Sequence, residues 1–174
     1  MAITLNGSAG VTTNSGAVYD GISRGTVVTA SGTSVDFTSI PSWVKRITVM
    51  FAGVSTSGTS NRLIQIGSTT FTTSGYSSYA MLTGSSSIQA ATTGVTAGFV
   101  MATNTAADVI GGSMVLVNVT GNTWASSHAT SLVTTNASFG GGYLALGGTL
   151  DRVRITTVNG TDTFDAGSIN ILYE

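Results

Sequence analysis

The sequence predicts an all-β protein: an antiparallel, jelly-roll-like β-sandwich formed by residues 30–174, preceded by a glycine-rich arm of residues 1–29. Three observations predict this fold. Of the 174 residues, 53 are serine or threonine and 23 are glycine, which suit strands and turns, whereas glutamate and lysine are almost absent. Apolar residues recur in short alternating runs that can bury one face of a strand. Turn-forming residues separate these runs at intervals of roughly ten residues, without helical periodicity, as is typical of a sandwich.

The arm differs from the rest of the chain in its glycine spacing. Glycines stand at Gly7, Gly10, Gly16, Gly21 and Gly25, and the apolar residues between them are isolated. A segment that buries little of its own surface either stays mobile or becomes ordered on a partner. We therefore expect an attachment arm. The alternative is that this segment forms the first strands of the sandwich.

Residues 46–54 carry the clearest strand pattern. Ile47, Val49 and Phe51 alternate with smaller or more polar residues, so that these three side chains share one face. Similar runs predict further strands at 62–66, 69–73, 79–82, 99–102, 114–119, 143–146, 152–158 and 169–173.

The composition and the N-terminus exclude several classes of protein. Charged residues make up only 7% of the chain and the net charge is -1, which excludes nucleic-acid binding through a basic surface. The lack of cysteine excludes disulfides, thiolate metal sites and thiol nucleophiles. No apolar run approaches the roughly 18 residues of a membrane helix. The N-terminus lacks the basic start and apolar core of a secretory signal. We therefore expect that the chain assembles in a cytoplasm and does not insert into a membrane.

One motif of hydrolases occurs in the arm. Gly21-Ile-Ser-Arg-Gly25 matches the pattern of a nucleophile elbow, and Asp108 and His128 follow in the order of a Ser, Asp, His triad. That elbow requires a helix after the serine, whereas β-branched residues follow here, so we interpret the match as a loop. A glycan depolymerase would need paired carboxylates at a cleft. We expect no enzymatic activity and no cofactor.

Two features of the sequence could contribute to metal sites. His128 is the single histidine, so one chain cannot supply two histidine ligands, and we interpret this residue as a surface or subunit contact. Asp162 and Asp165 could offer oxygen ligands to calcium. The competing interpretation, which we favour, is that these aspartates cap turns through their own hydrogen bonds.

Three aromatic residues suggest a recognition surface. Tyr76, Tyr79 and Trp124 stand among serine, threonine, glycine and asparagine, a mixture that can stack on a sugar ring and bond its hydroxyls. We predict that they contact a receptor or glycan. The alternative is that they belong to the core or to an interface.

Two stretches of the chain resemble a known family. They are VDFTSIPSWVKRITVMFAGVSTSGTSN at 35–61, followed by 65–67, and DTFDAGSINILYE at 162–174. They closely resemble a module of tailed-phage virion structural proteins, including tail fibres, and the opening MAITLNGS is similar to many fibre starts. Trp43 stands where this family is expected to carry a small residue, which indicates an additional packing or docking contact.

The resemblance implies a set of partners. Virion appendages are usually homotrimers, and a chain with so little charge can bury surface against its own copies. Other tail or capsid proteins are the expected attachment partners, and a host surface glycan is a further candidate. Docking to a subunit or to the virion is predicted at Ile3, Leu5, Tyr19 and Trp43.

The implied function is that of a phage virion structural protein. We expect a short tail fibre or spike subunit, attached by residues 1–29 and projecting residues 30–174 for host adsorption. The first alternative is a capsid decoration, cement or head-fibre protein, which the shortness of the chain favours. The second alternative is a glycan-binding adhesin.

Overall fold

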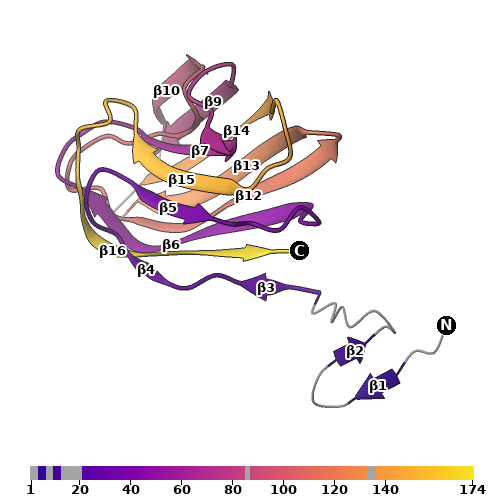
Figure 1. Cartoon of the computed structure of the whole chain (residues 1–174). Coiled ribbons are helices and arrows are strands. Elements are labelled where there is room, and N and C mark those ends of the chain that lie inside the picture. Colours follow the sequence, from indigo (N-terminus) through magenta and orange to yellow (C-terminus); the bar gives the residue numbers. More distant parts are fainter. Residues whose placement is uncertain (1–3, 7–9, 13–20, 85–86, 133–135) are drawn as a thin grey trace.

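The computed structural model describes residues 4–6, 10–12, 21–84, 87–132 and 136–174. These residues contain sixteen strands and no helix. A nine-stranded and a five-stranded antiparallel sheet pack against each other, as Figure 1 shows. The predicted all-β, antiparallel β-sandwich is therefore confirmed.

The larger sheet runs from β10 at one edge to the short strands β3 and β4 at the other. Both short strands pair with β16, one after the other along its length. The spatial order is β10 (Ile88–Val95), β9 (Ser77–Thr83), β14 (Asn136–Ala145), β13 (Thr123–Leu132), β12 (Ile110–Thr120), β6 (Arg46–Thr56), β16 (Phe164–Tyr173), then β3 (Ser23–Arg24) and β4 (Val28–Thr29).

The smaller sheet covers one face of the larger sheet. Its order is β11 (Phe99–Met101), β7 (Arg62–Ser68), β15 (Arg152–Thr157) and β5 (Val35–Thr38), and β8 (Thr70–Phe71) also pairs with β7. In addition, β1 (Thr4–Asn6) and β2 (Gly10–Thr12) pair with each other in a separate two-stranded sheet.

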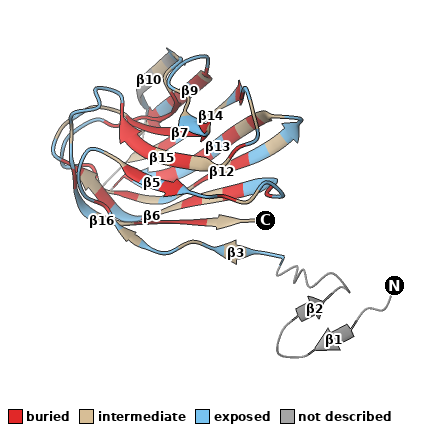
Figure 2. Cartoon of the chain, in the orientation of Figure 1, coloured by how far each residue is buried: buried red, intermediate tan, exposed pale blue. Residues whose placement is uncertain are grey.

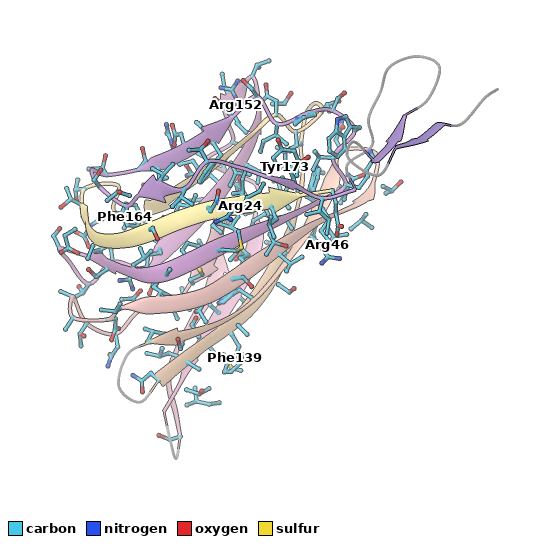
Figure 3. The ribbon with its side chains drawn as sticks, turned by 90° about the horizontal axis from the view of Figure 1, so that it is seen from below. Arg24, Arg46, Phe139, Arg152, Phe164 and Tyr173 are labelled. Carbon is cyan, nitrogen blue, oxygen red and sulfur yellow. The ribbon has the colours of Figure 1, made fainter. Side chains whose placement is uncertain are left out.

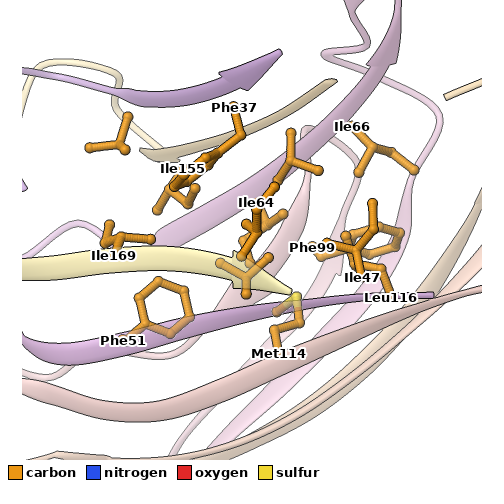
Figure 4. Packing of buried hydrophobic residues seen from close by; sticks show 14 of the residues in the cluster. Phe37, Ile47, Phe51, Ile64, Ile66, Phe99, Met114, Leu116, Ile155 and Ile169 are labelled. Atoms are coloured by element: carbon orange, nitrogen blue, oxygen red, sulfur yellow. The ribbon is translucent and has the colours of Figure 1, made fainter. Parts of the chain in front are cut away.

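The main core lies between the larger and the smaller sheet. On β6, Ile47, Val49 and Phe51 are buried as the sequence pattern predicts, and Figure 2 shows buried residues on the longer strands of both sheets. Figure 4 shows Ile155 of the smaller sheet above Phe51 of the larger sheet across this core. Each such side chain contributes about 1.5–3 kcal/mol through loss of apolar contact with water.

A second apolar cluster lies beneath the edge strand β11. The side chains come from both sheets and are small or medium in size: Leu63, Ala80, Leu82, Val100, Ala102 and Leu132. Two serines of the larger sheet complete the contact. Ser78 Oγ accepts a hydrogen bond from the Val100 amide at 2.9 Å, and Ser138 Oγ accepts one from the Ala102 amide at 3.0 Å. These hydroxyls replace the strand that β11 lacks on its outer side.

Part of the predicted arm lies along the edge of the larger sheet. Beyond the pairing of β3 and β4 with β16, the Gly25 amide donates to the Ile171 carbonyl at 2.8 Å, and the Ala30 amide donates to Gly167 at 3.0 Å. A Cβ atom at Gly25 would lie 2.9 Å from the Ile171 side chain, so this close approach requires glycine.

Candidate binding surfaces

The outer face of β9 and β14 carries a group of exposed aromatic residues. Tyr79, Phe139 and Tyr143 are 52%, 45% and 60% exposed. Strand register places Tyr79 opposite Gly141, and Met81 opposite Phe139. A shallow hollow of about 310 Å³, which we call the aromatic hollow, is lined by Tyr79, Met81, Phe139 and Gly141. Its walls are almost entirely apolar, so it suits an apolar group.

Three consecutive glycines explain why this hollow has a bare floor. A Cβ atom at Gly140 or Gly142 would lie closer than 3 Å to the backbone of β9, and one at Gly141 would approach the Ser126 carbonyl to 2.9 Å. The central part of β14 can therefore carry no side chain on either face. The rings at Phe139 and Tyr143 stand on either side of this gap.

A second hollow, of about 380 Å³, lies over β7 and β15 in the smaller sheet. We call it the polar hollow, because Gln65, Arg154, Thr156 and Asn159 are among its lining residues. Gln65 Nε2 donates to the Ala97 carbonyl at 2.9 Å, and Thr156 Oγ1 donates to Thr33 at 2.9 Å. Hydroxyl and amide groups held in place in this way suit a polar ligand.

Two ion pairs beside this hollow share one aromatic ring. Arg154 donates two hydrogen bonds of 2.7 Å to the Asp36 carboxylate, and its guanidinium lies 4.1 Å from the ring centre of Phe71. Arg152 pairs with Asp151 at 2.7 Å. These hydrogen bonds raise the pKa of Arg154 and lower that of Asp151. Both arginines are thus paired within the chain.

The structure places Tyr76 in the core, contrary to the predicted glycan contact. Its ring packs edge-on against Phe99 with 4.9 Å between the ring centres, and its exposed fraction is 2%. Its hydroxyl accepts from the Ile66 amide at 2.8 Å and lies 3.0 Å from the Thr72 carbonyl. Burial raises the pKa of Tyr76 well above its ordinary value. A ligand cannot reach this ring, so the prediction is corrected here.

Trp124 is also a core residue. It is 3% exposed and belongs to the main apolar cluster, although it lines a hollow of about 280 Å³ together with Lys45 and Asn118. No ring face is available for stacking on a sugar, and the predicted contact at Trp124 is corrected as well. Of the three aromatic candidates, Tyr79 alone is on the surface.

The predicted docking residues have different locations. Trp43 is 45% exposed in the turn before β6, and its ring centre lies 5.9 Å from that of Tyr173. Leu5 lies in β1 and pairs with Val11. Ile3 and Tyr19 lie outside the described residues. Docking at these positions stays a prediction.

Asp162 precedes β16 and Asp165 lies on β16, and both accept hydrogen bonds from residues 55–60. Asp162 accepts from Asn159 Nδ2 at 2.7 Å and from the Ser60 amide at 3.0 Å, and these bonds lower its pKa. Asp165 accepts a hydrogen bond from the Ser55 hydroxyl. Among the described residues, no cluster of three or more acidic, histidine or cysteine side chains could hold a metal ion. The Asx-type cap of this turn is Asn159, whose Oδ1 accepts from the Thr161 and Asp162 amides at 3.1 Å. Asp162 joins the turn to the loop at Ser60, and Asp165 bonds to β6, so the predicted caps at these two aspartates are wrong.

The residues of the hydrolase motif do not meet. Ser23 lies on β3, and His128 lies on β13 in the same sheet, with β12, β6 and β16 between them. Four strand spacings separate them by roughly 19 Å. His128 Nε2 instead lies 3.1 Å from Ser138 Oγ, and burial lowers the pKa of this imidazole to about 4. The predicted surface or subunit contact at His128 is corrected, since this residue is only 7% exposed.

The sequence does not predict the burial of one arginine. Arg62 is 1% exposed and donates to Thr103 Oγ1 at 2.7 Å and to the Asp108 carbonyl at 2.8 Å. Burial lowers its pKa. These bonds attach the loop after β11 to β7, so we assign Arg62 a structural role. The only indication of this burial in the sequence is that Arg62 stands at the start of an apolar strand.

Comparison with known proteins does not add a relative. A scan against family models, a search of curated proteins and a search of solved structures each find no match. The part of the chain that the structure describes contains no helix long and apolar enough to cross a membrane.

Proposed function

We propose that this chain is a phage virion structural protein, a short tail fibre or spike subunit that forms a homotrimer. Residues at the N-terminus attach the chain to the particle, and the β-sandwich projects for host adsorption. The proposal rests on the resemblance of two sequence segments to tailed-phage virion proteins and on how these segments lie in the fold.

The observation that carries the proposal is the division of the larger sheet into two halves. The two resembling segments build β6 and β16, which pair with each other beside the arm strands β3 and β4. The intervening residues build β9, β12, β13 and β14 in the other half. Strand spacing puts β14 about 24 Å from β3, and Figure 3 shows Phe139 and Arg24 well apart. In the proposed function, the half with the arm strands supports attachment, and the other half lies away from the point of attachment.

The experiment that tests the proposal is cryo-electron microscopy of the intact particle, with the copies of this chain counted. We expect a few trimers at the tail, with the sandwich pointing outward. Density spread over the capsid lattice in hundreds of copies would instead support the capsid decoration alternative. Absence from purified particles, checked by mass spectrometry, would overturn both.

A host glycan ligand is a second candidate function, and the polar hollow is the observation that favours it. Sugar hydroxyls bind well to fixed amide and hydroxyl groups such as those of Gln65 and Thr156. Thr73→Trp would fill the hollow from its exposed rim, whereas Tyr79→Ser removes a ring from the aromatic hollow. On a glycan array, loss of binding in only one variant assigns the ligand to that hollow. Unchanged binding in both, or no binding by the wild type, contradicts this candidate.

A further inference from the structure

The larger sheet has an outer face without charge over four adjacent strands. We call the outward side of β9, β14, β13 and β12 the uncharged face. Strand register aligns Tyr79, Gly141, Ser127 and Val115 in one row across it. Its largest outward side chains are Tyr79, Met81, Phe139, Tyr143, Val115 and Val117.

The absence of charge extends through all of the chain that builds this face. Between residues 63 and 150 the sequence contains one charged residue, Asp108, and it is buried. The smaller sheet, by contrast, carries the partly exposed ion pairs of Arg154 with Asp36 and of Arg152 with Asp151. Surfaces in contact with water normally carry about a quarter charged residues. The outer side of the smaller sheet is therefore suited to contact with water, and the uncharged face to contact with another protein surface.

The size of the uncharged face is that of a protein interface. Four strands about 4.8 Å apart, each with about eight residues at 3.3 Å, give a face of roughly 500–600 Å². The neighbouring strand β6 adds roughly 130 Å². The sum reaches the lower end of the about 600–1,000 Å² that a stable interface buries on each partner. Five large side chains of the face, Tyr79, Met81, Phe139, Tyr143 and Val117, are each at least 41% exposed.

The chemistry of the face selects the partner. A strongly charged partner would lose its hydration against this surface without gaining an opposite charge. A chain with 7% charged residues does not incur that cost. Val117, 41% exposed on the same sheet, is a branched apolar side chain of the kind that the aromatic hollow can take.

We propose that the uncharged face is the surface through which copies of this chain pack together. This inference rests on the proposed function only for the number of copies, three. It assigns Tyr79 and Phe139 to contacts between subunits, and it leaves the polar hollow of the smaller sheet facing outward.

The test is sedimentation equilibrium of the full chain and of two charged variants. Tyr79→Lys and Val117→Lys place a charge on exposed positions of the face. Each should raise the dissociation constant of the oligomer by about 100-fold or more, because the lysine loses its hydration in the contact. The matched control is Val158→Lys, which alters an exposed valine after β15, away from this face, and should leave the oligomer intact.

A second measurement locates the contact directly. The chain contains no cysteine, so Ser127→Cys introduces a single thiol on the uncharged face, and Ser74→Cys introduces one in an exposed loop. In the oligomer, we expect maleimide to label Ser127→Cys at least ten times more slowly than Ser74→Cys.

Two results would overturn this inference. One is a wild-type chain that is monomeric at every concentration, and the other is an oligomer that both lysine variants retain. Either result would leave the proposed function standing, since the microscopy of the particle tests that separately.

Discussion

Among single residues, His128 gives the clearest dependence on pH. Its folded-state pKa of about 4 lies below the ordinary value of 6.5 because the imidazole is buried on the inner side of β13. The unfolded chain therefore binds a proton near pH 6.5, whereas the folded chain binds it only near pH 4. Between these values a falling pH favours unfolding, and above pH 6.5 this residue has no effect.

We predict that the free energy of unfolding falls by roughly 2–3 kcal/mol between pH 7 and pH 4 on account of His128. Urea unfolding at several pH values measures it. His128→Gln should lose most of this pH dependence, whereas Ser126→Ala, a buried variant on the same strand that does not titrate, should keep it. An equal slope in both variants would contradict the assignment.

Gly140 is a second residue whose identity the packing dictates. A methyl group there would lie closer than 3 Å to the Tyr79 carbonyl oxygen and to the His128 ring. Gly140→Ala should lower the free energy of unfolding by about 3 kcal/mol, since the nearest atoms include backbone that cannot move away. At Gly147 a Cβ atom meets nothing within 4 Å. Gly147→Ala should therefore change stability by less than about 0.5 kcal/mol, and thermal unfolding compares the two.

At the scale of elements, β11 and the residue that follows it depend on side chains of the larger sheet for two hydrogen bonds. The amides of Val100 and Ala102 donate to Ser78 and Ser138 rather than to a neighbouring strand. A buried amide without a partner costs about 1–3 kcal/mol. The edge of β11 is thus closed by two hydroxyls.

We predict that Ser138→Ala lowers the free energy of unfolding by about 1–3 kcal/mol, because it removes the acceptor of a buried amide. The matched control is Ser126→Ala, since Ser126 Oγ is buried without a hydrogen-bond partner. That variant should be neutral or slightly stabilising. Hydrogen exchange should show faster exchange of the Ala102 amide in the first variant only, and similar losses of stability in both would refute this account.

The elements also differ in how well the sequence predicts them. The run at 46–54 predicts β6 because bulky residues alternate with polar ones, and each is placed as expected. In the first half of β14, serine, alanine and glycine replace those residues, and at Gly140 the backbone of β9 and the His128 ring leave no room for a side chain. No run of alternating bulky apolar residues marks 123–132 or 136–142, so in this region the sequence predicts a strand only at 143–146.

The candidate surfaces were predictable to a smaller extent. An aromatic residue among serines and glycines has the same local sequence whether it faces water or the core, as Tyr79 and Tyr76 illustrate. The pairing that brings Phe139 beside Met81 joins strands more than fifty residues apart. By contrast, the sequence alone shows the lack of charge between residues 63 and 150. The strand order is needed to show that the strands of this segment share one uncharged face.

For the whole molecule, the strand pairing divides the predicted arm at about residue 21. The sandwich gains the pairing of β3 and β4 with β16, whereas β1 and β2 pair with each other only. Removing residues 1–20 should therefore change the melting temperature by less than about 2 °C. Removing residues 1–29 also exposes the edge of β16 and the Ile171 carbonyl, so it should lower the melting temperature by at least about 5 °C. If attachment resides in the first twenty residues, the shorter deletion folds normally and is missing from purified particles. Normal incorporation of that deletion would show that attachment lies in the sandwich itself.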